Sequence, residues 1–120
     1  MKNSCILLLL FVSPAALADL ADCSIHSTSN KARATLAKVT LEAARATALA
    51  QVHAPATAKV HSELEVEQGC LVYSFDIKWK GRSGTQEVMV DAGDGKVLSV
   101  AHETSAQEAA EKAAEAKEHR

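Results

Sequence analysis

The segment from Cys70 to Lys80 alternates strictly between two kinds of side chain. One set is apolar (Leu71, Tyr73, Phe75, Ile77 and Trp79), and the other is mostly polar (Val72, Ser74, Asp76, Lys78 and Lys80). A period of two residues is typical of a β-strand with one buried face. Every aromatic residue beyond position 11 belongs to the apolar set. This strand therefore supplies the centre of any core that the chain can build.

The flanking segments predict three more strands. In residues 60–67 the apolar side chains occupy even positions and the charges occupy odd ones, which indicates a strand with one solvated face. Residues 85–92, with Val88 and Val90 facing inward, and residues 96–102 predict two further strands. Gln68-Gly69, Gly81 to Gly84 and Gly93 to Gly95 supply the residues that turns favour.

One helix is predicted over residues 41–53. Thr40 is its N-cap, and Leu41, Ala44, Ala48 and Val52 form a stripe at helical spacing. A single helix followed by an antiparallel meander predicts an α+β fold, in which the main helix packs on a four-stranded sheet. After it, residues 103–120 form a charged tail rich in Ala, Glu and Lys. There Ser105 to Glu108 fits a capping box, and we expect a solvated helix.

The N-terminal residues indicate export. Lys2 precedes an unbroken apolar run from Cys5 to Val12, and Ala16-Leu17-Ala18 has the small-x-small pattern of a signal peptidase site. We expect a signal peptide over residues 1–18, a flexible leader over 19–32 and a periplasmic or secreted protein without a transmembrane anchor. The alternative is a lipoprotein attached through Cys23, although Asp22 stands where a lipobox requires a small residue.

Two cysteines, Cys23 and Cys70, remain after cleavage. An even number of thiols in an oxidising compartment favours a disulfide, and closing this loop would restrict the unfolded chain by about 4 kcal/mol. The alternative is that Cys70 is a small apolar residue of the strand and Cys23 is free in a mobile leader.

Several short motifs together resemble the PepSY domain family. They include Leu71-Val72-Tyr73-Ser74-Phe75-Asp76-Ile77, and the most specific of them is Val90-Asp91-Ala92 followed by Gly95-Lys96-Val97, which resembles the family's closing hairpin. The resemblance covers residues 33–101 of a domain that we place at 33–102, and it departs at Ala54-Pro55-Ala56, where the family usually has a Pro-Gly helix stop. It implies a non-catalytic module that regulates or inhibits peptidases outside the cytoplasm, and it leaves the partner open.

Charge and motif content argue against two classes of function, nucleic-acid binding and catalysis. The net charge of −2, with acids and bases interspersed, argues against a nucleic-acid partner. No glycine-flanked nucleophile elbow occurs, so we expect no enzymatic activity and no cofactor. Asp91 and Asp94 are expected to form a plain turn, because an EF-hand loop needs more oxygen ligands than this segment offers.

Two functional hypotheses remain. In the first, the chain binds another exported protein, for which a peptidase is a candidate, through a free sheet edge or through a polar face carrying His61, Glu63, Glu65, Asp76 and Lys78. These charges would equally serve to solvate the sheet. In the second, histidines including His26, His53, His61 and His102 carry zinc, copper or haem, although none of their spacings matches a zinc motif.

Overall fold

The computed structural model describes residues 22–27 and 34–118. The elements follow the order η3 (Ala34–Leu36), α1 (Leu41–Gln51), β1 (Lys59–Glu67), β2 (Cys70–Trp79), β3 (Arg82–Asp91), β4 (Val97–Glu103) and α2 (Ser105–Glu118). The four strands form one antiparallel sheet in the order β1-β2-β3-β4. The predicted α+β meander is therefore confirmed, whereas the predicted signal peptide lies outside the described residues.

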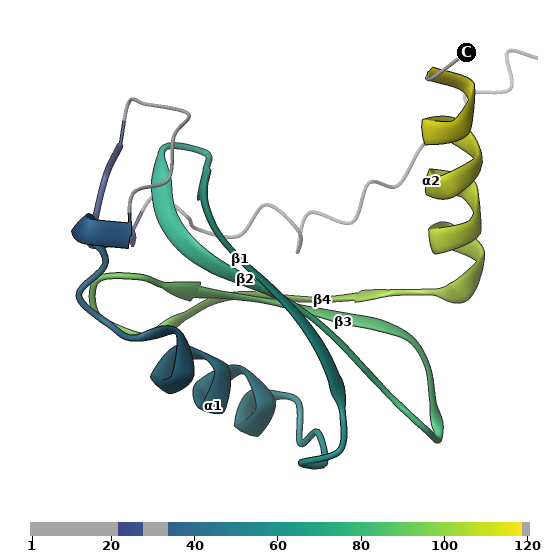
Figure 1. Cartoon of the computed structure of the whole chain (residues 1–120), viewed down its shortest axis with the longest axis horizontal. Coiled ribbons are helices and arrows are strands. Elements are labelled where there is room, and N and C mark those ends of the chain that lie inside the picture. The colour runs from purple at the N-terminus through teal and green to yellow at the C-terminus, as the bar shows by residue number, and fades with distance from the viewer. Residues whose placement is uncertain (1–21, 28–33, 119–120) are drawn as a thin grey trace, which may run out of the picture.

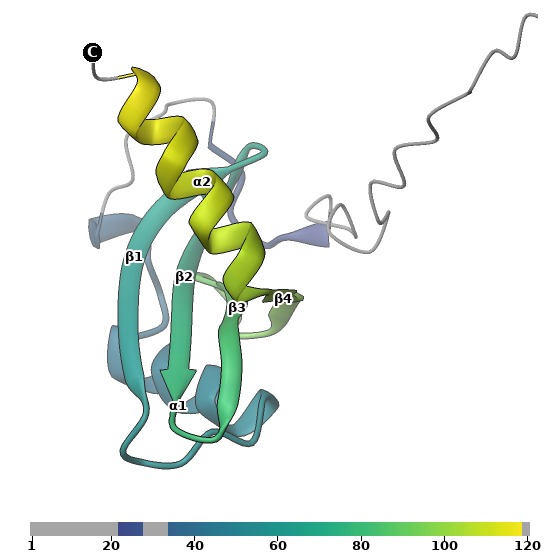
Figure 2. The ribbon, with the colours of Figure 1, turned by 90° about the vertical axis from the view of Figure 1, so that its right-hand side faces the viewer.

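The two helices lie on opposite faces of the sheet (Figures 1 and 2). α1 packs against one face, and α2 crosses in front of the strands on the other. We call the face under α1 the core face and the opposite one the second face. Among the described residues, no helix combines the length and the apolar character needed to cross a bilayer.

The core face is built around β2, as the alternation of that strand predicts. Leu71, Phe75 and Ile77 are fully buried, and Tyr73 is nearly so. Ala44 and Ala48 of α1 are also fully buried, because their methyl groups let the helix approach the aromatic rings closely. Val88 and Val90 of β3 complete this core, while Trp79 packs at its margin. The Tyr73 hydroxyl donates to the carbonyl oxygen of Val39 at 2.8 Å and so ties the start of α1 to the sheet.

Element ends differ from the prediction where the backbone turns sharply. α1 ends at Gln51 instead of residue 53, since His53 takes a positive φ of 56° that a helix cannot continue. Leu41, predicted to lie on the buried stripe, is 44% exposed. β3 begins at Arg82 instead of residue 85, because Gly81, with φ of 94°, lets the chain reverse directly after β2.

The start of α2 also differs by one residue from the predicted capping box. Thr104 is the cap: its N–H donates to Oε1 of Gln107 at 2.8 Å, and the N–H of Gln107 donates back to Oγ1 of Thr104 at 3.2 Å. This reciprocal pair satisfies two backbone donors at the start of the helix. α2 is consequently aimed across the sheet directly after β4 (Figure 2).

Replacing Phe75 by Ala should lower the free energy of unfolding by about 3–5 kcal/mol, because removal of a fully buried ring from the centre of the core leaves a cavity. Chemical denaturation of the purified chain measures this change. Leu41→Ala is the matched control in the same protein and should change stability by less than about 0.5 kcal/mol. Equal effects of the two substitutions would contradict the assignment of the core face.

Candidate functional site

The five residues of the predicted partner-binding surface share the second face. His61 on β1 pairs across the strands with Asp76 on β2, and Glu63 pairs with Ser74. Glu65 is two residues from Glu63, and Lys78 is two residues from Asp76, so both side chains lie on the same face of the sheet as these residues. His61 and Glu63 are exposed and contact each other at 3.2 Å. The arrangement as one surface is thus observed, while its role in binding remains a prediction.

Charge is graded along this face. Glu63, Glu65 and Glu67 occupy the end of β1, whereas Lys59 and Lys78 lie at the opposite end of the β1–β2 pair. Burial, with the neighbouring carboxylates Glu67 and Glu63, raises the pKa of Glu65. Burial also raises the pKa of Asp76. One end of the face therefore accumulates acidic groups at close range, and a cationic partner group would relieve their repulsion.

α2 is attached to the basic end of the second face through Glu108. One carboxylate oxygen of Glu108 contacts the Lys78 ammonium at 2.9 Å, and the other accepts a hydrogen bond from the Thr85 hydroxyl. These bonds lower the pKa of Glu108, with the Thr85 hydroxyl contributing most. The predicted fully solvated tail therefore touches the sheet near its first turn.

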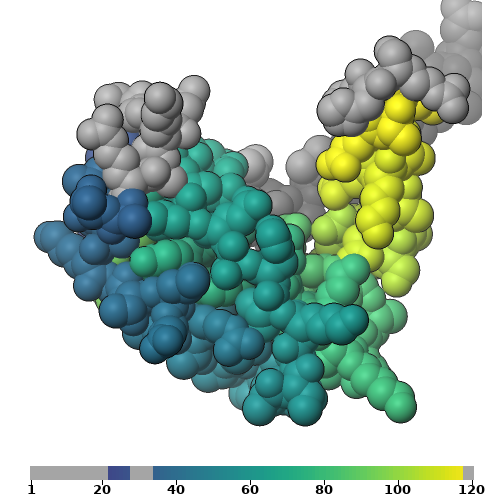
Figure 3. Space-filling model, viewed as in Figure 1, coloured from purple at the N-terminus to yellow at the C-terminus, as the bar shows by residue number. Residues whose placement is uncertain are grey.

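Between α2 and the second face lies a hollow of about 420 Å³, visible beside the yellow helix in Figure 3. Charged side chains from both walls line it, including His61, Asp76 and Lys78 from the sheet and Glu111 from α2. The hollow is a consequence of the docking of α2.

Three carboxyl groups meet where β3, β4 and α2 converge. Burial, together with the neighbouring Glu111 and Glu87, raises the pKa of Glu103 to about 7. Oε1 of Glu103 is buried without a hydrogen-bond donor. Burial, followed by the charge of Asp76, raises the pKa of Glu87 as well. Repulsion among these groups thus opposes the docking of α2 once they ionise.

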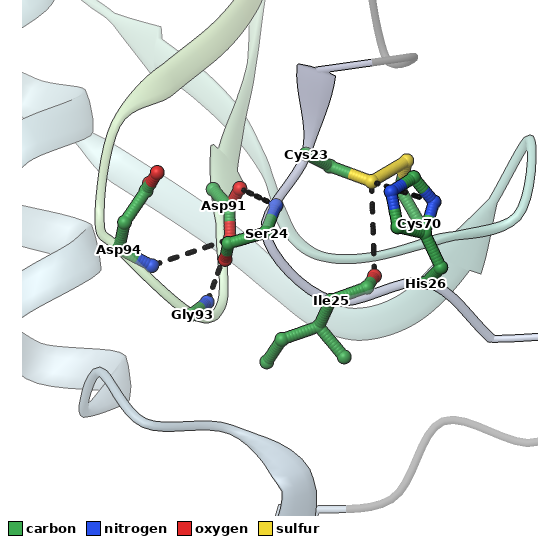
Figure 4. The surroundings of a disulfide bond; sticks show 8 residues. All are labelled: Cys23, Ser24, Ile25, His26, Cys70, Asp91, Gly93 and Asp94. Carbon is green, nitrogen blue, oxygen red and sulfur yellow. Dashed lines mark hydrogen bonds between the residues drawn. A yellow bond between two sulfur atoms is a disulfide. The ribbon is translucent and has the colours of Figure 1, made fainter.

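A disulfide joins Cys23 to Cys70 at the other end of the second face (Figure 4), as the cysteine count favoured. Both cysteines are buried and pack with Val72, Met89 and Leu98 in a small second cluster. Val72, predicted to lie on the polar face, is fully buried. An apolar patch therefore lies on this face beside Glu65 and Glu67, the strand partners of Val72 and Cys70.

Residues 22–27 belong with the folded unit, in contrast to the flexible leader predicted over 19–32. The Ser27 N–H donates to the Gly69 carbonyl at 2.8 Å, and the Leu71 N–H donates to the Ile25 carbonyl at 3.0 Å. These bonds place the segment beside the start of β2, where His26 forms a bridge with Cys70. The other residues of the predicted leader, 19–21 and 28–32, lie outside the described residues.

Asp91 joins this segment to the closing hairpin. Its fully buried carboxylate accepts hydrogen bonds from the Ser24 N–H and hydroxyl, both at 2.6 Å, and from the Gly93 N–H at 2.7 Å. Burial alone would raise the pKa of Asp91, but the hydrogen bonds outweigh it and lower the pKa. These donors occupy the carboxylate, so the aspartate has a structural role at this turn.

The other residues of the hairpin motif complete the junction. Val90 and Ala92 are fully buried, and Val97 packs against the same core. Gly95 supplies a positive φ of 78° at the turn, just before the exposed Lys96. The carbonyl of Ala92 accepts from the N–H groups of Lys38 and Val39 at 2.8 and 3.0 Å, which fixes the segment before α1. The motif thus connects three parts of the chain.

The chain belongs to the PepSY family. The family model described as "Peptidase propeptide and YPEB domain" matches residues 38–101, just over half of the chain. Comparison with curated proteins gave no significant match, and comparison with solved structures gave none either. Membership suggests a module like a propeptide or a peptidase inhibitor. PepSY domains are generally non-catalytic and typically extracytoplasmic.

Sequence reasoning missed the residues that attach the two ends of the chain. Ser24 was assigned to a flexible leader, although its position directly after Cys23 would carry it to the sheet once the disulfide forms. Glu108 was assigned to a solvated tail, although the short link after β4 was a signal that α2 must start beside the sheet. Of the histidines, the fold brings only His26 near the cysteines within the described residues.

The docking of α2 should weaken as pH rises. Because the pKa of Glu103 is about 7 in the folded chain and 4.5 as its ordinary value, the protonated group stabilises the docked state at low pH. This contribution is complete below about pH 4.5 and is lost as pH rises through about 7. Amide hydrogen exchange, corrected for its intrinsic pH dependence, should show stronger protection of α2 at pH 5 than at pH 8. Glu103→Gln should flatten this difference and Glu115→Gln, on the exposed part of α2, should keep it; identical profiles for both variants would refute the mechanism.

Proposed function

We propose that this protein is an exported, non-catalytic binding module that regulates a peptidase outside the cytoplasm. The family membership supports the class of role, and the disulfide is consistent with an oxidising compartment. The observation that carries the proposal is the graded second face, because it gathers the five candidate residues beside an edge strand of nine residues, β1.

β1 offers a backbone edge as well as side chains. It is the first strand of the sheet order, and within the described residues only β2 pairs with it. An extended segment of a partner could add to this edge by main-chain hydrogen bonds, as many peptide-binding domains allow. The acidic side chains at the end of β1 would then favour a partner with basic groups and reject an acidic one.

The chemistry of the face fits binding better than turnover. Its hollow is lined by charged groups and opens to solvent beside α2 (Figure 3), whereas catalysis usually requires a site from which water is excluded. The fully buried carboxylate Asp91 is held by several donors in a structural junction. We therefore assign the charged groups to partner recognition.

The test uses the full chain as bait in the exported fraction of its native host, followed by peptidase assays on the captured protein. The wild type should capture a peptidase and slow its turnover. Glu63→Lys, an exposed change on β1, should weaken this inhibition about five- to tenfold. The matched control is Glu42→Lys, the same charge change at an exposed position of α1. This variant should leave inhibition unchanged.

Two results would contradict the proposal. Loss of inhibition in Glu42→Lys but not in Glu63→Lys would place the partner on the helix side of the molecule. Hydrolysis of peptides by the purified chain without a partner would show that it is an enzyme. Melting temperatures of both variants distinguish a lost contact from a lost fold.

A further inference from the structure

His26 lies beside the disulfide, and the three side chains form a cluster of ligand type (Figure 4). Nδ1 of His26 is 3.7 Å from Sγ of Cys23. The ligand atoms of Cys23, His26 and Cys70 all lie within 4.8 Å of one another. Neither the binding surface on β1 nor the closing hairpin uses the imidazole of His26, which is exposed while both cysteines are buried.

We propose that reduction of the Cys23–Cys70 disulfide creates a binding site for Zn²⁺ with two thiolate ligands and one imidazole ligand. In the oxidised chain the sulfurs are bonded to each other and cannot serve as thiolates. Metal binding at this site therefore requires reduction of the disulfide. This inference does not depend on the peptidase-regulating role proposed above.

The spacing of the ligands suits a tetrahedral ion. With Zn–S bonds of about 2.3 Å and Zn–N bonds of about 2.0–2.1 Å, a tetrahedral site separates sulfur from nitrogen by about 3.6 Å and the two sulfurs by about 3.8 Å. The observed 3.7 Å between Cys23 Sγ and His26 Nδ1 already matches the first separation. Once the bond between them is broken, the sulfurs need only move apart to reach the second.

Backbone contacts hold the three residues together independently of the disulfide. The Ser27 and Leu71 N–H groups donate across the junction at 2.8 and 3.0 Å, one on each side of the His26–Cys70 bridge. On the other side of Cys23, Ser24 donates two hydrogen bonds to the buried Asp91 carboxylate. The segment therefore keeps its place after reduction, and the ligands remain preorganised.

The redox and proton balance is simple. A dithiol reductant, such as an exported thiol–disulfide oxidoreductase, transfers two electrons and two protons to the sulfurs and becomes a disulfide itself. Zn²⁺ then displaces the two thiol protons, and the neutral imidazole of His26 donates its Nδ1 lone pair. Three protein ligands leave a fourth position for water or a group from a partner, on the exposed side where His26 lies.

The test titrates the full chain with Co²⁺, a spectroscopic substitute for Zn²⁺, before and after reduction by a non-thiol phosphine. The reduced chain should bind one Co²⁺ with thiolate-to-metal charge-transfer absorption, and Zn²⁺ should displace it; the oxidised chain should show neither effect. His26→Asn should weaken Co²⁺ binding at least about tenfold. His53→Asn is the matched control, because asparagine tolerates the positive φ of that residue, and it should bind as the wild type does.

The proposal would be overturned if the oxidised and reduced chains bound Co²⁺ with equal affinity, or if the reduced chain bound none. Equal affinity of His26→Asn and the wild type for Co²⁺ would also overturn it. Near-ultraviolet circular dichroism of Trp79 and Tyr73 monitors the fold throughout. If reduction abolishes that signal and Zn²⁺ does not restore it, the preorganised site does not exist and the proposal is wrong. Retention of the signal, with Zn²⁺-dependent protection of both thiols from alkylation, would support it.

Discussion

A sheet has two faces, and α1, with 11 residues, covers only one of them. The aromatic side of β2 is buried by Ala44 and Ala48, whereas Val72, Met89 and Leu98 point to the opposite side and need another cover. The chain supplies that cover from its two ends. Residues 22–27 cover the apolar patch beside Glu65 and Glu67 at one end of the second face, and α2 crosses the basic end (Figures 1 and 2). Between these two covers lies the surface to which we assign partner binding.

The two covers differ in how firmly they are held. The N-terminal segment is joined by a disulfide, by strand-like backbone hydrogen bonds and by the buried carboxylate of Asp91. α2 contacts the sheet through Glu108, which accepts a hydrogen bond from the Thr85 hydroxyl and forms a partly exposed ion pair with Lys78. Such ion pairs contribute little in water, and repulsion near Glu103 opposes the docking. The N-terminal segment is therefore held more firmly than α2, and we expect the docking of α2 to weaken as pH rises.

Much of the fold follows from the sequence, since one strand carries all the aromatic residues of the core and its alternation sets the register of its neighbours. Thr40 and the pairing of Cys23 with Cys70 were also predictable from capping and from cysteine count. The attachment of the chain ends was not, because Ser24 and Glu108 are polar residues in segments without hydrophobic periodicity. Their positions depend on contacts with Asp91 and Lys78, which lie far away along the chain. The five candidate residues were placed on one face by parity alone, but parity did not reveal that the leader and α2 lie at its two ends.

Amide hydrogen exchange at Ser24 and Ser27 tests most directly whether the N-terminal segment is a fixed cover of the second face. Their N–H groups donate to Asp91 and to Gly69, so both should be protected nearly as well as the amides at the centre of β2. Asp91→Asn should remove most of the protection at Ser24 while leaving the centre of β2 protected. Exchange of Ser24 and Ser27 in the wild type at the rate of an unfolded peptide would contradict the account.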